Sequence, residues 1–119
     1  MNQEVALFLA VLLHSSTNAH FMHWSTNSAS DHSALGEYYE RVIELVDNFA
    51  EAYMGRYEQI KEFPSDWHVE REPVPYFEKM KLFIEESRKM LPQDTELQNL
   101  IDEIADLINS TLFKLKYLD

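Results

Sequence analysis

The stretch DTELQNLIDEIADLINSTLFKL, residues 94–115, decides the fold class of this chain. Its apolar residues recur at steps of three and four, the spacing that keeps side chains on one face of an α-helix. Asp94 suits the N-cap and Glu96 suits the first turn, where the helix dipole favours a carboxylate. We therefore predict an amphipathic helix whose buried face consists of Leu97, Leu100, Ile101, Ile104, Leu107, Ile108, Leu112 and Leu115.

Two long helical patterns lie in the first half of the chain. Residues 2–26 are predicted to form a helix with Asn2 as its cap, ending in a polar run of serines and threonine. A second helix is expected from about Ser30 to Tyr57, because its apolar residues again recur at steps of three and four. These core positions are Leu35, Tyr39, Val42, Val46, Phe49 and Tyr53.

A long connection and a third helix complete the pattern. Residues 61–74 contain two prolines and show no helical period, so they are predicted to be irregular. Pro75 suits the first turn of the next helix, where its missing N–H costs little, and the helix should stop before Pro92. Four helices with a longer connection between the second and third predict an all-α four-helix bundle, formed as a single domain by residues 1–119.

Aromatic residues gather around the long connection. They are Tyr53, Tyr57, Phe63, Trp67, Tyr76 and Phe77. Aromatics at the end of a bundle are more often core than binding platform, so we expect these six to close the core. The isolated His14, and His68 beside Trp67, are likewise interpreted as structural.

Composition excludes several functional classes. The 119 residues include 10 basic and 21 acidic side chains, for a formal net charge of -11, which opposes direct nucleic acid binding. No cysteine is present, so disulfides and thiolate metal sites are excluded. The apolar run at residues 5–13 follows Glu4 without a basic residue and is too short for a membrane span. We therefore expect a cytoplasmic protein that does not bind membranes.

The second helix carries a second apolar stripe. After its core stripe is assigned, Gly36, Ile43, Ala50 and Met54 lie on a different side, spaced in sevens and fours. A monomer does not need this stripe, and a glycine inside a helix is tolerated where another backbone packs closely. The stripe predicts a helix-to-helix contact with another copy, in a dimer or a larger homo-oligomer.

Three of the five histidines are crowded together, at His20, His23 and His32. His20 and His23 share a side of the first helix, and we expect the histidines to lie where the first two helices meet. On the second helix Asp47 and Glu51 are four residues apart and border the second apolar stripe. Nitrogen and oxygen ligands of this kind suit iron, zinc or manganese. The alternative is that the histidines are structural groups at the core edge.

The pattern His23-Trp24, His32 and Asp47-Asn-Phe-Ala-Glu51 resembles the ferroxidase signature of Dps-type proteins in the ferritin-like superfamily. The resemblance implies a ferritin-like bundle that oxidises or sequesters iron. It also implies that the histidines of one subunit face the carboxylates of its partner. In that family twelve residues separate the two histidines, as from His20 to His32, whereas His23 precedes His32 by nine. Either His20 or His23 is therefore the first-helix ligand.

The sequence from Trp24 to Tyr39 is more similar to short ferritin-like proteins encoded by tailed phages. This resemblance would place the chain in the host cytoplasm. Two functional hypotheses follow from these observations. The first is a Dps-like metal-binding protein, with ferroxidase activity left open, whose metal ligands come from His20, His23, His32, Asp47 and Glu51. The second is a metal-free helical oligomer that serves as a binding or structural module.

Overall fold

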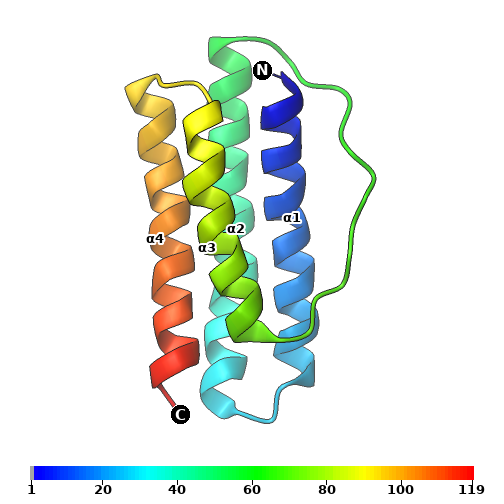
Figure 1. The fold of residues 1–119 in the computed structure, drawn as a ribbon, viewed down its shortest axis with the longest axis vertical. Coiled ribbons are helices and arrows are strands. Elements are labelled where there is room, and N and C mark those ends of the chain that lie inside the picture. Colours follow the sequence, from blue (N-terminus) through cyan, green and yellow to red (C-terminus); the bar gives the residue numbers. More distant parts are fainter. Residues whose placement is uncertain (1) are drawn as a thin grey trace.

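The computed structural model describes residues 2–119 and contains four α-helices over that range. They are α1 (Asn2–Ser25), α2 (Ala29–Arg56), α3 (Pro73–Met90) and α4 (Thr95–Tyr117). α1 packs against α2, α2 against α4, and α4 against α3, with a lighter contact between α1 and α3 (Figure 1). This arrangement confirms the predicted all-α four-helix bundle.

One long crossover gives the bundle its topology. The two short turns, α1–α2 and α3–α4, join antiparallel neighbours, whereas residues 57–72 run the length of the bundle beside α1 (Figure 1). As a result α2 and α3 run in the same direction on opposite corners of the bundle. A single long crossover is one of the known connectivities of four-helix bundles.

The core forms where the helical stripes meet, as the sequence period requires. Of the eight apolar positions predicted on α4, six are buried, and Leu100 and Leu107 pack against the core from its edge. Phe8 of α1 meets Phe49 of α2 edge-on with ring centroids 5.3 Å apart. Tyr38 of α2 meets Phe77 of α3 in the same manner at 4.7 Å.

Buried polar side chains connect α1 to α2. The Ser15 hydroxyl lies 2.7 Å from the Tyr38 hydroxyl, and the Ser16 hydroxyl donates to the Tyr39 carbonyl. Complete burial raises the pKa of Tyr38 beyond the usual range of tyrosine. Small hydroxyl residues on α1 therefore allow it to approach α2 closely while the polar groups stay satisfied.

Three expected details of the helix starts differ in the structure. Asn2 lies in the first turn of α1, and its side chain bonds Tyr53 and Glu58 instead of capping the helix. α3 begins at Pro73, two residues earlier than predicted. Asp94 is the N-cap of α4, but its carboxylate makes no cap hydrogen bond and instead accepts from the Tyr57 hydroxyl. For Asn2 and Asp94 a tertiary partner replaced the expected local cap bond.

α1 is the most apolar helix of the described chain. Its length and its mean hydropathy of 1.3 over an 18-residue window reach the range of membrane spans, contrary to the estimate from residues 5–13 alone. In the structure 61% of that window is buried inside the bundle, as in the core helix of a helical domain. Large apolar side chains nevertheless remain exposed on α1, namely Leu7, Leu13, Phe21 and Trp24.

Candidate metal site

His23 and His32 form a stacked pair at the α1–α2 turn. Their ring centroids are 3.7 Å apart and the ring planes differ by 18°. Nδ1 of His23 lies 2.6 Å from the carbonyl oxygen of His32, and Nδ1 of His32 lies 2.9 Å from the carbonyl oxygen of His23. The two residues thus bond each other reciprocally across the turn.

The reciprocal bonds fix which nitrogen of each ring carries a proton. A carbonyl oxygen only accepts hydrogen bonds, so both Nδ1 atoms must be the donors. In the neutral rings this leaves Nε2 of His23 and Nε2 of His32 with a free lone pair. Histidines that bind metals commonly donate their other nitrogen to a backbone carbonyl in this way. The turn therefore presents two oriented nitrogen acceptors.

His20 joins the pair from one turn earlier on α1. Its ring stacks on Tyr39 with centroids 3.9 Å apart and planes 10° apart, and it lies 4.5 Å from the Trp24 ring. The centroid of its ring is 6.2 Å from that of His23. The structure thus brings all three predicted histidines together, with His23 in contact with His32 and His20 in a second layer.

Gly36 has a different role from the one predicted. A Cβ built on Gly36 would come 3.0 Å from Cε1 of His23, so the missing side chain makes room for that ring. Ala50 and Met54 are half-buried and pack against the core of the same chain, whereas Ile43 is exposed. The glycine is therefore explained within one chain, and only part of the predicted second stripe remains free.

The carboxylates lie far from the histidines within one chain. The side chains of Asp47 and Glu51 are exposed and form no hydrogen bond or ion pair with any described residue. Along a straight helix Asp47 lies about 22 Å from His32, and Glu51 about 28 Å. Accordingly, no group of three or more histidine, aspartate or glutamate side chains in residues 2–119 is placed to hold a metal ion.

The other two histidines occupy the interface with the crossover. His14 stacks on Trp67 with centroids 5.3 Å apart, and the backbone carbonyl of His68 accepts from the Asn18 side chain. The sequence predicts Tyr39 only as a core position of the second helix and does not predict its stacking on His20. Stacking of this type has no local sequence signal, because it depends on how α1 and α2 are rotated against each other.

These features define a class of protein: an all-α bundle with one crossover and a paired-histidine turn between its first two helices. The chain belongs to DUF5856, a family of unknown function, whose model matches residues 23–115. The matched segment contains His23, His32, Asp47 and Glu51, and it begins after His20. No curated protein and no solved structure matches the chain.

Proposed function

We propose that this protein is a ferritin-like, Dps-type metal-binding protein whose site forms between two copies of the chain. The observation that supports the proposal is the reciprocal pairing of His23 and His32, which leaves Nε2 of both rings available to a metal. Two nitrogens alone leave a divalent ion underliganded and its charge uncompensated. Asp47 and Glu51 supply unpaired carboxylates, but about 22 Å or more along α2 from His32. A partner chain is needed to unite the two sets.

A two-fold contact along α2 would meet this requirement. If two α2 helices cross antiparallel near Tyr39, halfway between His32 and Asp47, then each His32 approaches Asp47 of the partner subunit. Two equal sites result, each with nitrogens from one chain and carboxylates from the other. Closed dimers are the commonest symmetric assemblies, and this one would place every proposed ligand at the contact.

The outer surface of α1 and α2 favours self-association. Glu4 is the only formally charged residue among the 24 residues of α1, in a chain whose net charge is -11. Leu13 is 45% exposed, Trp24 67% and Ile43 of α2 42%. Like charges disfavour contact between two acidic chains, so association is least costly through an uncharged face. This face lies beside both the histidine pair and Asp47.

Iron is the metal that the resemblance implies, and the nitrogen and carboxylate donors fit ferrous iron, zinc or manganese. Oxidation of bound ferrous iron is the activity that the resemblance adds to simple binding. In this proposal the residues bind and position the ion between subunits. The proposed cargo is therefore iron, and the proposed partner is a second copy of the chain.

Metal loading of paired variants tests the proposal. The protein is purified without chelator, incubated with ferrous iron, zinc or manganese at neutral pH, desalted and analysed for metal. We expect at most residual metal in the His23→Ala/His32→Ala protein and equally little in the Asp47→Asn/Glu51→Gln protein. The Glu103→Gln/Asp106→Asn protein, altered at exposed carboxylates of α4, is the matched control and should retain the metal.

Mixed dimers give the sharper test of an inter-subunit site. When the histidine variant and the carboxylate variant are combined, one of the two sites in each mixed dimer is rebuilt from intact halves. Recovery of about half the wild-type metal in confirmed mixed dimers is therefore expected. Failure to recover any metal in such dimers places the site within one chain and contradicts the proposal.

The second candidate is a metal-free oligomer that acts as a binding or structural module, in phage infection if the chain is phage-encoded. The exposed apolar side chains of α1 favour it, because they would be covered in an oligomer whether or not metal binds. Wild-type protein that forms a dimer or larger oligomer by light scattering, and that retains none of the three metals, supports this candidate over the first.

A further inference from the structure

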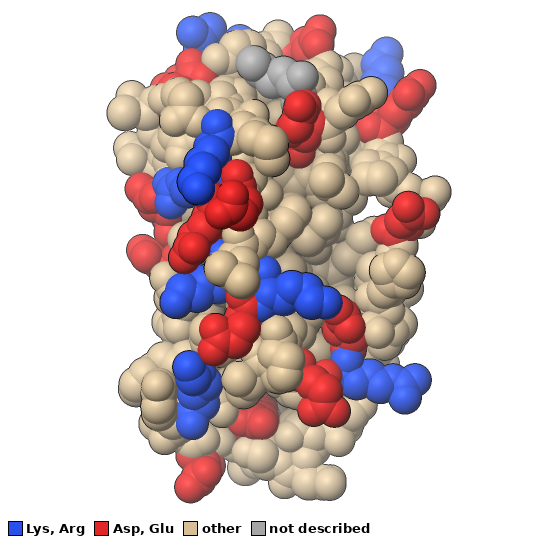
Figure 2. Space-filling view, in the orientation of Figure 1, with Lys and Arg blue, Asp and Glu red and all other residues tan. Residues whose placement is uncertain are grey.

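The crossover has more length than its path requires. Residues 57–72 return along a bundle whose longest extent is 43 Å. Sixteen extended residues reach about 53 Å. The surplus allows the segment to stand away from the helices, and an opening between it and the body of the bundle is visible at the right of Figure 2.

The crossover is attached at its two ends and unattached in its middle. Near its start Ile60 is buried in the core, and Tyr57 bonds Asp94. Near its end Asn18 bonds the backbone of His68 and of Glu70. Between these attachments residues 61–66 are exposed and form no hydrogen bond, ion pair or ring contact with any described residue. The unattached part crosses the first turns of α1.

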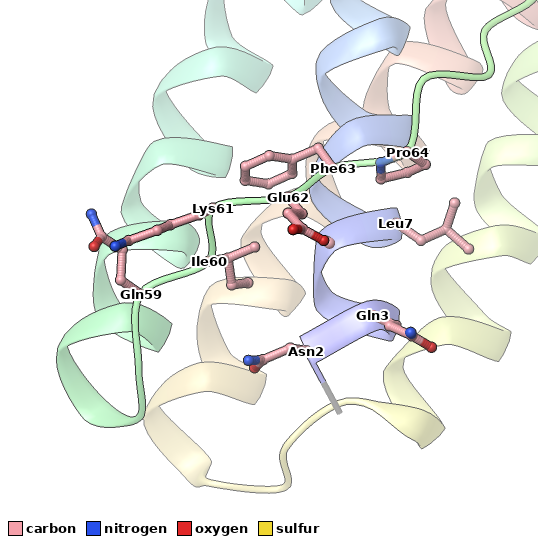
Figure 3. A pocket seen from close by; sticks show the side chains of 10 residues that line it. Asn2, Gln3, Leu7, Gln59, Ile60, Lys61, Glu62, Phe63 and Pro64 are labelled. Carbon is pink, nitrogen blue, oxygen red and sulfur yellow. The ribbon is translucent and has the colours of Figure 1, made fainter.

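A cavity of about 660 Å³ lies between the unattached segment and α1. Its lining comes from the first two turns of α1 and from residues 59–64 (Figure 3). Volumes of 300–1,000 Å³ are typical of sites for small organic ligands. The size of the cavity therefore suits one small molecule and is far larger than a bound water requires.

The cavity walls are largely apolar. Ala6 and Ile60 are buried among the lining residues, while Leu7 is 47% and Phe63 50% exposed. Of the six aromatics expected to close the core, Tyr57, Phe63 and Trp67 are exposed, and Phe63 lines the cavity instead. Both large apolar side chains, Leu7 and Phe63, remain partly exposed, so a ligand that covers them would gain hydrophobic stabilisation.

The polar groups of the cavity select an uncharged ligand. The Asn2 amide is already engaged by Tyr53 and Glu58, whereas the Gln3 and Gln59 amides bond no described residue. A free amide both donates and accepts, which suits a hydroxyl, amine, carbonyl or amide group. Among the described lining residues the one cation is Lys61, which is adjacent to a lining glutamate, and the chain carries a net charge of -11. An anionic ligand would be repelled.

We infer that the cavity between the first turns of α1 and residues 59–64 binds an uncharged, mainly apolar small molecule bearing one hydrogen-bonding group. The apolar body covers the exposed surface of Leu7 and Phe63, and the polar group meets the amide of Gln3. This site is on the opposite end of α1 from His23 (Figure 1) and needs neither metal nor a second chain. The experiment on this site therefore does not depend on whether the proposed metal site exists.

A fluorescent probe of the right chemistry tests the inference. N-phenyl-1-naphthylamine is uncharged, has one N–H donor and brightens in apolar surroundings. We expect saturable binding of one probe per chain. The anionic relative 1-anilinonaphthalene-8-sulfonate, with nearly the same apolar skeleton, should bind at least about tenfold more weakly. Equal affinity for the two probes would overturn the charge argument.

Matched variants locate the probe. Leu7→Gln and Phe63→Ser should each weaken binding about tenfold or more. Leu13→Gln on the same helix and Phe113→Ser on α4 change side chains of similar exposure outside the cavity, and should leave the affinity within about twofold. Circular dichroism checks that each variant is folded. Leu7→Trp, which fills the cavity without removing apolar surface, should also abolish binding.

Three results overturn the inference. The first is the absence of saturable binding by the wild-type chain. The second is a loss of binding in the Leu13 and Phe113 variants as large as that in the Leu7 and Phe63 variants, which would mean general adhesion to exposed apolar surface. The third is binding that appears only with concentration-dependent association in light scattering and shifts with it, which would assign the cavity to a second copy.

Discussion

The two short turns of the bundle each join a pair of antiparallel helices, but different side chains hold them together. At the α3–α4 turn Arg88 donates to the side chain and backbone of Gln98, and Gln93 donates to the carbonyls of Arg88 and Leu91. The Gln98 amide in turn donates to the Arg88 carbonyl at 3.1 Å. The Arg88 guanidinium thus only donates, whereas the Gln98 side-chain amide both donates and accepts within this turn.

At the α1–α2 turn two imidazoles make the connection, each through one nitrogen only. The other nitrogen of His23 and of His32 remains an available acceptor. The comparison shows that side chains that hold a turn together can also bind a ligand only if they keep donors or acceptors that the turn does not use. The Arg88 guanidinium of the α3–α4 turn has no lone pair to offer a metal, so we propose a binding role for the histidine turn and a stabilising role for the arginine turn.

The largest expected effect comes from removing the space that His23 occupies. Gly36→Leu should lower the free energy of unfolding by about 2–3 kcal/mol, because the new side chain meets the trapped His23 ring. Urea unfolding measures this loss. Gly55→Leu is the control, since a Cβ there meets nothing within 4 Å, and it should not destabilise. A His23→Ala background should reduce the cost of Gly36→Leu by at least about 1 kcal/mol.

Truncating one residue in each of the two short turns compares how much each turn contributes to stability. Arg88→Ala should cost about 1.5–2 kcal/mol of stability, because it removes charge-assisted bonds to Gln98 and Asp102 from a partly buried side chain. His32→Ala, at an exposed ring, should cost below about 1 kcal/mol. Thermal unfolding compares the two. A larger loss for His32→Ala than for Arg88→Ala would reverse the assignment of stability to the arginine turn.

The N-caps of the helices that follow the two turns also differ. The Ser28 hydroxyl accepts from the backbone N–H of Asp31 and caps α2, whereas Asp94 makes no side-chain cap bond on α4. Ser28→Ala should therefore lower stability by about 1 kcal/mol. Ser33→Ala, the same change at an exposed site without a hydrogen bond to a described residue, should stay within about 0.5 kcal/mol of wild type.

The smallest expected effect is a pH dependence at the α3–α4 end. The Tyr57 hydroxyl, donating to Asp94 at 2.5 Å, is the main cause that lowers the pKa of that carboxyl below its ordinary value of 3.8. A lowered folded-state pKa stabilises the fold above the ordinary value, and this contribution is lost as the pH falls through the folded-state pKa. Tyr57→Phe should therefore be slightly less stable than wild type at pH 6, and the difference should shrink by about pH 3. An unchanged difference at both pH values would contradict this cause.

The sequence by itself determined the helices and their core faces. The stripe on residues 94–115, the two proline-bounded ends of α3 and the irregular stretch before it all follow from local rules. Periodicity, capping and the missing N–H of proline act within a few residues, so they can be read without knowing the fold. The crowding of His20 and His23 was also predictable, because residues three apart share a helix face.

Only the tertiary structure decided what those residues touch. The three-residue turn after α1 and the rotation of α1 against α2 bring His23 onto His32 and beneath Gly36, and no local pattern encodes that rotation. The same packing leaves Asp47 on the outer surface, far along α2 from the histidines, and lets the long crossover stand away from Leu7. The physical reason is range: helix formation depends on neighbours in sequence, whereas contacts between helices depend on all four packing at once.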